Sequence, residues 1–138
     1  MMRTGGLRIT RPRLAVIRAL ESAESALSPN SLHSRIRAEG QKIDLVSVYR
    51  ILSALVELGL VHRIGSADGY RACTLGGDHS AHGQHLVCSS CLRTLESSIS
   101  PEVVSEGLNA AQEAGYACGA VQVEIIAVCP KCQASPAD

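Results

Sequence analysis

The feature that most constrains this chain is a pair of C-x-x-C motifs in its second half, separated by 37 residues. Four soft thiolates suit the tetrahedral coordination of a structural zinc ion, and each C-x-x-C turn supplies two of them. Disulfides are disfavoured because the sequence has no export signal, and a thioredoxin-type redox site needs only one such motif. We therefore predict a structural zinc site with the ligands Cys88, Cys91, Cys129 and Cys132.

The segment between the two motifs is longer than the roughly 15–20 residues that separate them in compact zinc sites. Ser100-Pro101 is a helix start, and apolar residues at helical spacing follow it as far as Gly115. Residues 121–125 then alternate between apolar and polar side chains, as in a strand. We expect a strand–helix–strand unit, in which the metal holds the last strand against the first motif.

Three helices and a hairpin are predicted in the first half. Thr10, Ser28 and Asp44 are suitable N-caps, and apolar residues recur at helical spacing after each of them. The segments 60–64 and 70–73 are predicted strands around a turn that contains Asp-Gly. Three helices followed by a hairpin are typical of a winged helix-turn-helix, in which the hairpin is the wing.

The formal net charge of zero is the sum of two unequal halves. Residues 1–64 carry ten Lys and Arg against five Asp and Glu, a net charge of +5. Residues 65–138 carry three against eight, a net charge of −5, and hold all six cysteines. This asymmetry indicates two parts with different roles, of which the basic one is suited to contact phosphate.

The third predicted helix places Tyr49, Arg50 and Ser53 on the face opposite its apolar stripe. An exposed Tyr beside an exposed Arg near the start of a packed helix suits insertion into a DNA major groove. The alternative is an ordinary solvated face. The helix-then-hairpin context favours DNA.

A second group of metal ligands lies between the predicted wing and the first C-x-x-C motif. Three histidines follow Cys73 at three-residue spacing, and four of the chain's five histidines lie between His62 and His85. Mixed nitrogen and sulfur ligands, with one carboxylate, favour zinc over ferrous iron or manganese. A metal bound there, where two parts of the chain meet, would fix their relative orientation.

Taken in order, these motifs resemble the ferric uptake regulator (Fur) family of bacterial metal-dependent repressors, over about residues 8–132. The motifs are Thr10-x-x-Arg13, Leu45-Val-Ser-Val-Tyr49-Arg50-x-Leu52, Gly59-Leu60-Val61, the His-rich segment and the two C-x-x-C pairs. The chain is most similar to the zinc uptake regulator (Zur) branch. The contiguous His-His-Asp-His stretch of the iron sensors is absent, and no His follows His85.

The resemblance implies a regulatory zinc site between the two parts of the chain. Its ligands would be His62, Cys73, His82 and Glu96, with His79 and His85 as alternative loop ligands or members of a further site. The resemblance also implies DNA contacts: Tyr49 to thymine methyls or the sugar-phosphate edge, and the arginines to phosphate. The expected DNA-binding residues are Arg11, Arg13, Ser47, Tyr49 and Arg50.

The resulting expectation is an α+β protein with an N-terminal winged helix-turn-helix domain and a small α/β dimerisation domain with a four-Cys zinc site. The expected boundaries are 1–73 for the DNA-binding domain, 74–84 for a His-rich hinge loop and 85–138 for the dimerisation domain. As a cytoplasmic homodimer it would repress zinc uptake genes, binding palindromic operator DNA with zinc as corepressor. We expect no membrane association and no organic cofactor.

Three other functions remain possible from the sequence. The first is a family member that senses iron, manganese or peroxide. The second is a thiol/disulfide redox protein, for which Cys118 is the only suggestive residue, and the third is a zinc-stabilised interaction module without DNA affinity. Catalysis is not expected, because we find no nucleophile–base pair, phosphate-binding loop or paired carboxylates.

Overall fold

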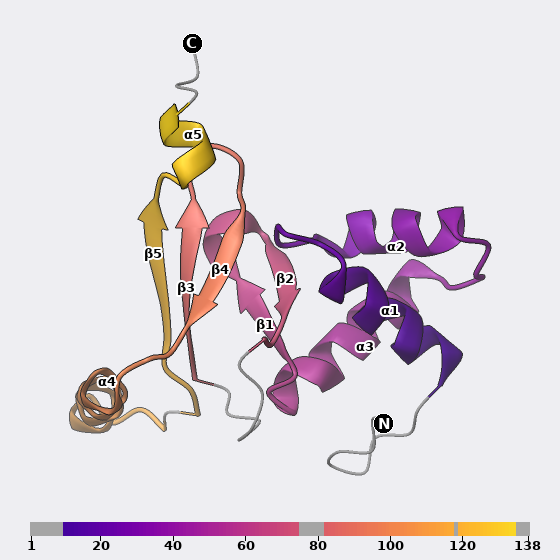
Figure 1. The fold of residues 1–138 in the computed structure, drawn as a ribbon. Helices are drawn as coiled ribbons and strands as arrows, with labels where there is room; N and C mark the ends of the chain where they lie inside the picture. The colour runs from indigo at the N-terminus through magenta and orange to yellow at the C-terminus, as the bar shows by residue number, and fades with distance from the viewer. Residues whose placement is uncertain (1–9, 75–81, 118, 135–138) are drawn as a thin grey trace.

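Two small sheets organise the fold, which we describe from a computed structural model for residues 10–74, 82–117 and 119–134. A two-stranded hairpin, β1–β2, lies between three N-terminal helices and a three-stranded sheet (Figure 1). The expected α+β class is therefore confirmed. No helix in the described ranges is long and apolar enough to cross a membrane.

The three N-terminal helices begin at the predicted caps. They are α1 (Arg11–Glu21), α2 (Pro29–Ala38) and α3 (Leu45–Glu57). The side chains of Thr10, Ser28 and Asp44 each accept a hydrogen bond from the backbone N–H three residues on, which satisfies a donor that the first turn leaves free.

The apolar faces of these helices pack into one core with the first strand. Val16, Leu32, Val48, Leu52 and Leu55 are all fully buried in it. Complete burial of such aliphatic side chains stabilises the fold by about 1.5–3 kcal/mol each. The core therefore holds α3 firmly while its opposite face stays open to solvent.

The hairpin follows directly from α3. It consists of β1 (Val61–Ile64), a short 3-10 turn (η1, Gly65–Ala67) and β2 (Gly69–Ala72). Asp68 adopts a left-handed conformation with φ of 49°, which Asp tolerates better than most residues and which closes the predicted turn. An antiparallel bridge between Leu27 and Tyr70 ties the loop before α2 to the hairpin.

The second sheet has the strand order β4-β3-β5. The central strand β3 (Gly83–Cys88) pairs antiparallel with β4 (Thr94–Ser97) and parallel with β5 (Gln122–Ala127). The predicted strand–helix–strand unit between the C-x-x-C motifs is confirmed as β4, α4 (Pro101–Glu113) and β5. Strand β3 was not expected from the sequence, and it begins within the segment expected to be a hinge loop.

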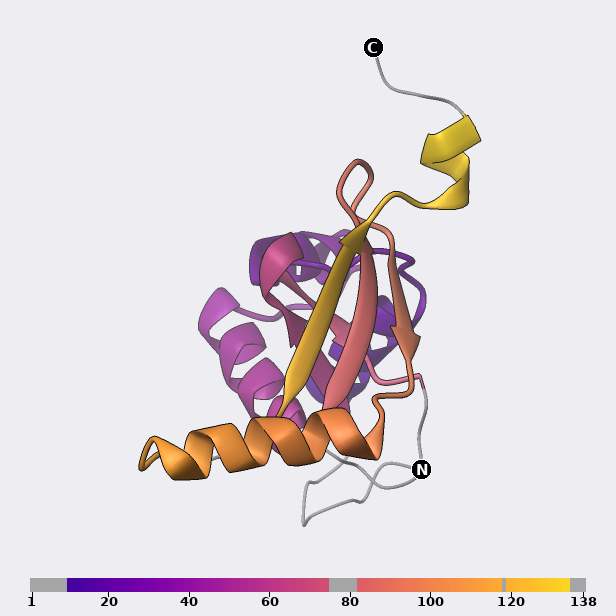
Figure 2. The same ribbon diagram turned by 90° about the vertical axis from the view of Figure 1, so that its left-hand side faces the viewer.

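Helix α4 runs across the end of the sheet at which β3 and β5 begin (Figure 2). It packs closely there, because a Cβ added at Gly107 would lie 2.9 Å from a side-chain carbon of Val121. No residue of α4 is buried. The chain continues from β5 into a short helix, α5 (Pro130–Ala134), at the opposite end of the sheet.

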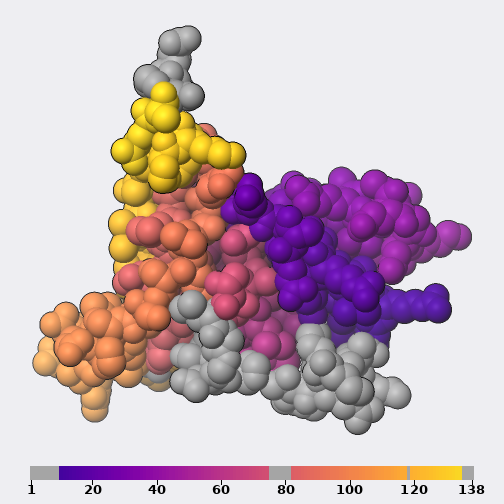
Figure 3. Space-filling view, in the orientation of Figure 1, coloured from indigo at the N-terminus to yellow at the C-terminus, as the bar shows by residue number. Residues whose placement is uncertain are grey.

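The three-stranded sheet also contacts the loop between α1 and α2. Arg93 forms an ion pair with Glu24 at 3.0 Å, and the Thr94 N–H donates to the Glu24 carbonyl at 3.0 Å. Arg71 of β2 donates to the carbonyls of Ala23 and Thr94. The loop between α1 and α2 therefore lies against the three-stranded sheet beside the hairpin, on the face that Figure 3 shows.

Candidate metal centres and nucleic-acid interface

The four cysteines of the two C-x-x-C motifs come together at the α5 end of the sheet. Cys88 ends β3 and Cys91 follows in the next turn, whereas Cys129 precedes α5 and Cys132 lies within it. Their sulfur atoms lie within 4.8 Å of one another, and the Sγ atoms of Cys91 and Cys129 are 3.7 Å apart. Tetrahedral zinc with Zn–S bonds of about 2.3 Å requires sulfur atoms about 3.8 Å apart, so the cluster fits zinc.

The pKa values of two of these thiols are shifted in opposite directions. Hydrogen bonds from the backbone N–H groups of Cys91 and Cys129 lower the pKa of Cys88 to about 6. In contrast, the hydrogen bond with Cys129 raises the pKa of Cys132 to about 12. A bound divalent cation would favour the thiolate form of all four sulfurs, so that none of them keeps its proton.

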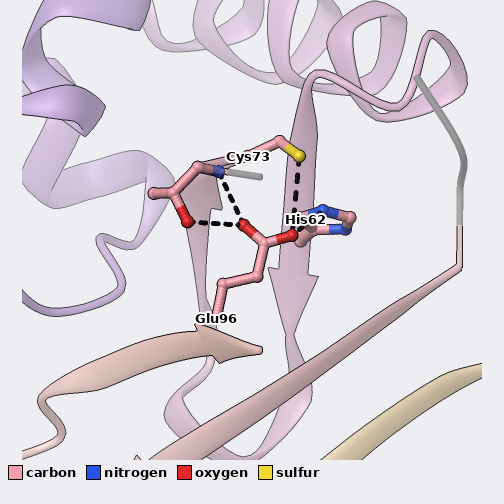
Figure 4. Close-up of polar contacts among 4 residues, drawn as sticks. His62, Cys73 and Glu96 are labelled. Carbon is pink, nitrogen blue, oxygen red and sulfur yellow. Dashed lines mark hydrogen bonds and ion pairs between the residues drawn. The ribbon is translucent and has the colours of Figure 1, made fainter. Parts of the chain in front are cut away.

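The second cluster is made of His62, Cys73 and Glu96, whose ligand atoms also lie within 4.8 Å of one another. His62 belongs to β1, Cys73 follows β2 and Glu96 comes from β4 (Figure 4). One Glu96 oxygen, Oε2, lies 3.1 Å from His62 Nε2 and 3.5 Å from Cys73 Sγ. These separations suit the edges of a tetrahedron around zinc bound by nitrogen, oxygen and sulfur.

The other carboxylate oxygen of Glu96 is held by Thr74. It accepts hydrogen bonds from the Thr74 N–H at 2.6 Å and from the Thr74 hydroxyl at 3.0 Å. Burial alone would raise the pKa of Glu96, but its contacts with His62 and Thr74 outweigh this effect and lower the pKa to about 2. Glu96 is therefore an ionised, oriented carboxylate with one oxygen turned towards His62 and Cys73.

His85 lies next to this cluster, on β3. Its ring centroid is 5.0 Å from that of His62, and burial lowers its pKa, which favours the neutral form that binds metals. Among the described residues, the buried Nε2 atom of His85 has no hydrogen-bond partner, whereas that of His62 is 3.1 Å from the Glu96 carboxylate. A buried imidazole nitrogen without a partner beside this cluster is a further indication of a metal.

The other two candidate histidines are placed differently. His82 does not join the cluster of three, and its Nδ1 accepts a hydrogen bond from the Val121 N–H at 2.8 Å. His79 lies outside the described residues.

The solvent-facing side of α3 carries Tyr49, with 48% of its surface exposed, and Arg50. Ser47, Arg50 and Arg13 line a shallow hollow of about 410 Å³ beside the start of α3. Arg11 lines a separate hollow beside α1. Arg13, Ser47 and Arg50 therefore lie together at the N-terminal end of α3, whereas Arg11 lies in the neighbouring hollow.

Sequence reasoning missed three residues at these sites. Thr74 orients Glu96, Lys42 lines both hollows, and Val46 is 57% exposed one turn before Arg50 on α3. Helical spacing could have identified Val46, because it precedes Tyr49 by three positions and Arg50 by four and so shares their helix face. Nothing in the sequence pattern distinguishes Thr74 or Lys42 from other polar residues.

The helices, the hairpin and the two ligand clusters define a winged helix-turn-helix protein with a metal-binding sheet. A model of the ferric uptake regulator family matches residues 4–126. The chain belongs to the ferric uptake regulator family, whose members are transcription regulators.

Three relatives are especially informative. The zinc uptake regulation protein of Mycobacterium tuberculosis H37Rv is 33% identical over 135 residues, which cover 96% of this chain and 99% of the relative. The crystal structure of holo XcZur superimposes with a TM-score of 0.78 at 29% identity, covering 94% and 89% of the two chains. A zinc uptake regulator complexed with zinc and DNA has a TM-score of 0.81 at 26% identity, covering 95% and 87%.

Proposed function

We propose that this chain is a zinc-responsive transcriptional repressor, which binds palindromic operator DNA as a homodimer with zinc as corepressor. It controls genes for zinc uptake. The similarity to zinc uptake regulators, one of them bound to zinc and DNA, supports this function. No catalytic step is assigned to the chain, and its site of action is the cytoplasm, where the operator DNA is.

The observation that carries the proposal is that the residues of the second ligand cluster come from both the hairpin and the three-stranded sheet. His62 and Cys73 belong to the hairpin, whereas Glu96 belongs to the three-stranded sheet. The three ligands meet only while the hairpin lies against the sheet, so zinc binding favours this arrangement. If DNA binds the same arrangement best, zinc and DNA raise each other's affinity by the same factor.

We assign zinc to both clusters, as a structural ion with the four cysteines and a regulatory ion with His62, Cys73 and Glu96. A histidine completes the regulatory set. The buried, unpartnered Nε2 of His85 supports His85, whereas His82 would have to offer the ring nitrogen that does not bond to Val121. His79 is the remaining alternative.

Helix α3 is proposed as the recognition helix. Tyr49 would contact bases or the sugar edge, while Arg50, Arg13, Arg11 and Ser47 would hold phosphates. The corresponding division of the chain is residues 1–73 for DNA binding, 74–84 as hinge and 85–138 for dimerisation.

Dimerisation through the three-stranded sheet is supported by its exposed apolar residues. Leu86, Leu95 and Ile125 share a face in the strand register and are 37%, 60% and 41% exposed. Helix α4 likewise has no buried residue. Burying these surfaces against a second copy would remove them from water and place two α3 helices for a palindrome.

A zinc titration of operator binding, followed by fluorescence anisotropy, tests the function. We expect wild-type protein to bind operator DNA only with zinc, and more weakly as the salt concentration rises. Cys73→Ser should not bind operator DNA when zinc is added. Cys118→Ser is the matched control, because the sequence assigns Cys118 to neither zinc site. Zinc-dependent binding that survives in Cys73→Ser would contradict the ligand assignment, and a response to iron but not to zinc would contradict the function.

A further inference from the structure

Glu124 of β5 contacts the turn of the hairpin from the other sheet. Its two carboxylate oxygens accept hydrogen bonds from the backbone N–H groups of Gly65 and Ser66, each at 2.8 Å. The partners are 59 and 58 residues apart in sequence. Successive N–H groups that converge on one anionic acceptor form charge-assisted hydrogen bonds, which are stronger than neutral ones.

Glu124 belongs to a row of three side chains that crosses the sheet. The strand register pairs Glu96 with His85 and His85 with Glu124, and paired residues in neighbouring strands project from the same face. All three contact the hairpin: Glu96 contacts His62 and Thr74, His85 contacts His62, and Glu124 contacts the turn. The regulatory cluster therefore lies at one end of the row and Glu124 at the other, about 10 Å away across two strand spacings.

A hairpin attached to the sheet at one end of this row could still pivot about that point. A second attachment at the turn removes this freedom. We propose that Glu124 is a positioning residue that holds the wing turn on the sheet, so that the regulatory metal and Glu124 together set the orientation of the wing for DNA binding. The inference rests on the proposed function, because it concerns the DNA-binding arrangement.

The same contacts would also suit a competing role for Glu124, and the test must distinguish that role from positioning. Backbone N–H groups at a wing turn are suitable donors for a DNA phosphate, and the Glu124 carboxylate occupies them in the present arrangement. If DNA took these donors, Glu124 would be a competitor, and its removal would strengthen DNA binding. The positioning role predicts instead that removing Glu124 weakens DNA binding.

The test compares Glu124→Ala and Glu124→Gln with wild type, with Glu21→Gln at the exposed end of α1 as the matched control. Backbone amide exchange of Gly65 and Ser66 is measured by NMR in zinc-loaded, DNA-free dimer. Operator affinity is measured separately with zinc in saturating excess. We expect both amides to exchange about tenfold faster in Glu124→Ala and operator affinity to fall about tenfold, with two zinc ions retained per chain.

Glu124→Gln keeps one carbonyl acceptor, so its amide exchange and operator affinity should lie between those of wild type and Glu124→Ala, whereas Glu21→Gln should match wild type. Unchanged amide exchange, or operator binding as tight as in wild type or tighter, would overturn the inference. Wild-type protein that fails to bind operator with zinc would instead overturn the proposed function, and with it the role of Glu124 in DNA binding. The exchange of the two amides reports on the attachment without DNA.

Discussion

Glu96 contacts two separate parts of the hairpin at once. One of its oxygens faces His62 and Cys73, and the other is held by Thr74 just beyond β2. The carboxylate is thereby oriented before a metal arrives, and a ligand held in its binding orientation loses little conformational entropy on coordination.

Removing the Thr74 hydroxyl tests this orientation. Thr74→Ala keeps the backbone N–H bond to Glu96 but loses the hydroxyl bond. Partners of metal ligands of this kind contribute about 10–100-fold to affinity, and we expect a loss near tenfold for the regulatory zinc. Competition with a chromophoric chelator measures the affinity. Thr74→Ser should restore it, and a Thr74→Ala protein with wild-type affinity would show that the hydroxyl has no orienting role.

The low pKa of Glu96 makes the stability of the metal-free protein depend on pH. Because this pKa is about 2 in the folded chain and about 4.3 in an unfolded one, ionised Glu96 stabilises the fold above pH 4.3. The contribution is lost as the pH falls from there towards 2. Urea unfolding of wild type and Glu96→Gln should give a difference in unfolding free energy that shrinks across this window. With Glu106→Gln as control, a difference that stays constant would contradict the assigned pKa.

At the scale of elements, α3 combines a rigid core face with an open outer face. Val48, Leu52 and Leu55 are fully buried, whereas Val46 and Tyr49 are about half exposed. Packing therefore fixes the direction in which the outer face presents its side chains. A helix held in this way can enter a groove without paying much ordering entropy.

Arg50→Ala tests whether this face contacts phosphate or bases. For a phosphate contact, binding should weaken by a similar factor on operator and scrambled DNA, and the salt slope should fall by about 0.9. For a base contact, the loss would be confined to operator DNA. Anisotropy titrations at several salt concentrations distinguish the two outcomes, and Arg35→Ala on α2 is the matched control.

The elements that the sequence predicted are those with local signals. Caps, helical spacing, the Asp-Gly turn and the alternation of apolar and polar residues correctly predicted α1 to α4, the hairpin and β5. Strand β3 is not predictable in this way, because its polar residues Gln84 and His85 resemble a ligand-bearing loop and its parallel partner lies beyond α4 in sequence. The contacts of Arg93 with Glu24 and of Glu124 with the hairpin turn are equally non-local, and no short-range pattern encodes them.

At the scale of the whole molecule, the two ligand clusters differ in what they join. The four-cysteine cluster joins the β3–β4 turn to the segment after β5 within the metal-binding sheet unit, whereas the second cluster joins that unit to the hairpin. The sequence predicted that the four thiols would come together and that three residues of the second cluster would do so, because residue type and motif spacing are visible in it. The placement of His82 and His85 depends on the course of β3, which could not be predicted from the sequence.

Stepwise chelation should separate the two ions. We expect two zinc ions per chain, of which a mild chelator removes one and abolishes operator binding while the dimer persists. A stronger chelator removes the second and the fold of the sheet unit is lost. Native mass spectrometry with circular dichroism measures both steps. Cys73→Ser should begin with one zinc ion, and loss of the fold in the first step would contradict the assignment.

Strand β5 has a further consequence for the monomer. Within the described chain it pairs with β3 alone, and Ile125, Ile126 and Val128 at its end are 41%, 55% and 43% exposed. A strand with an open edge and a β-branched apolar sequence is a template for uncontrolled pairing with other chains. A monomer released by dilution or by an interface substitution would therefore be prone to aggregation, so that dimerisation also protects the protein's solubility.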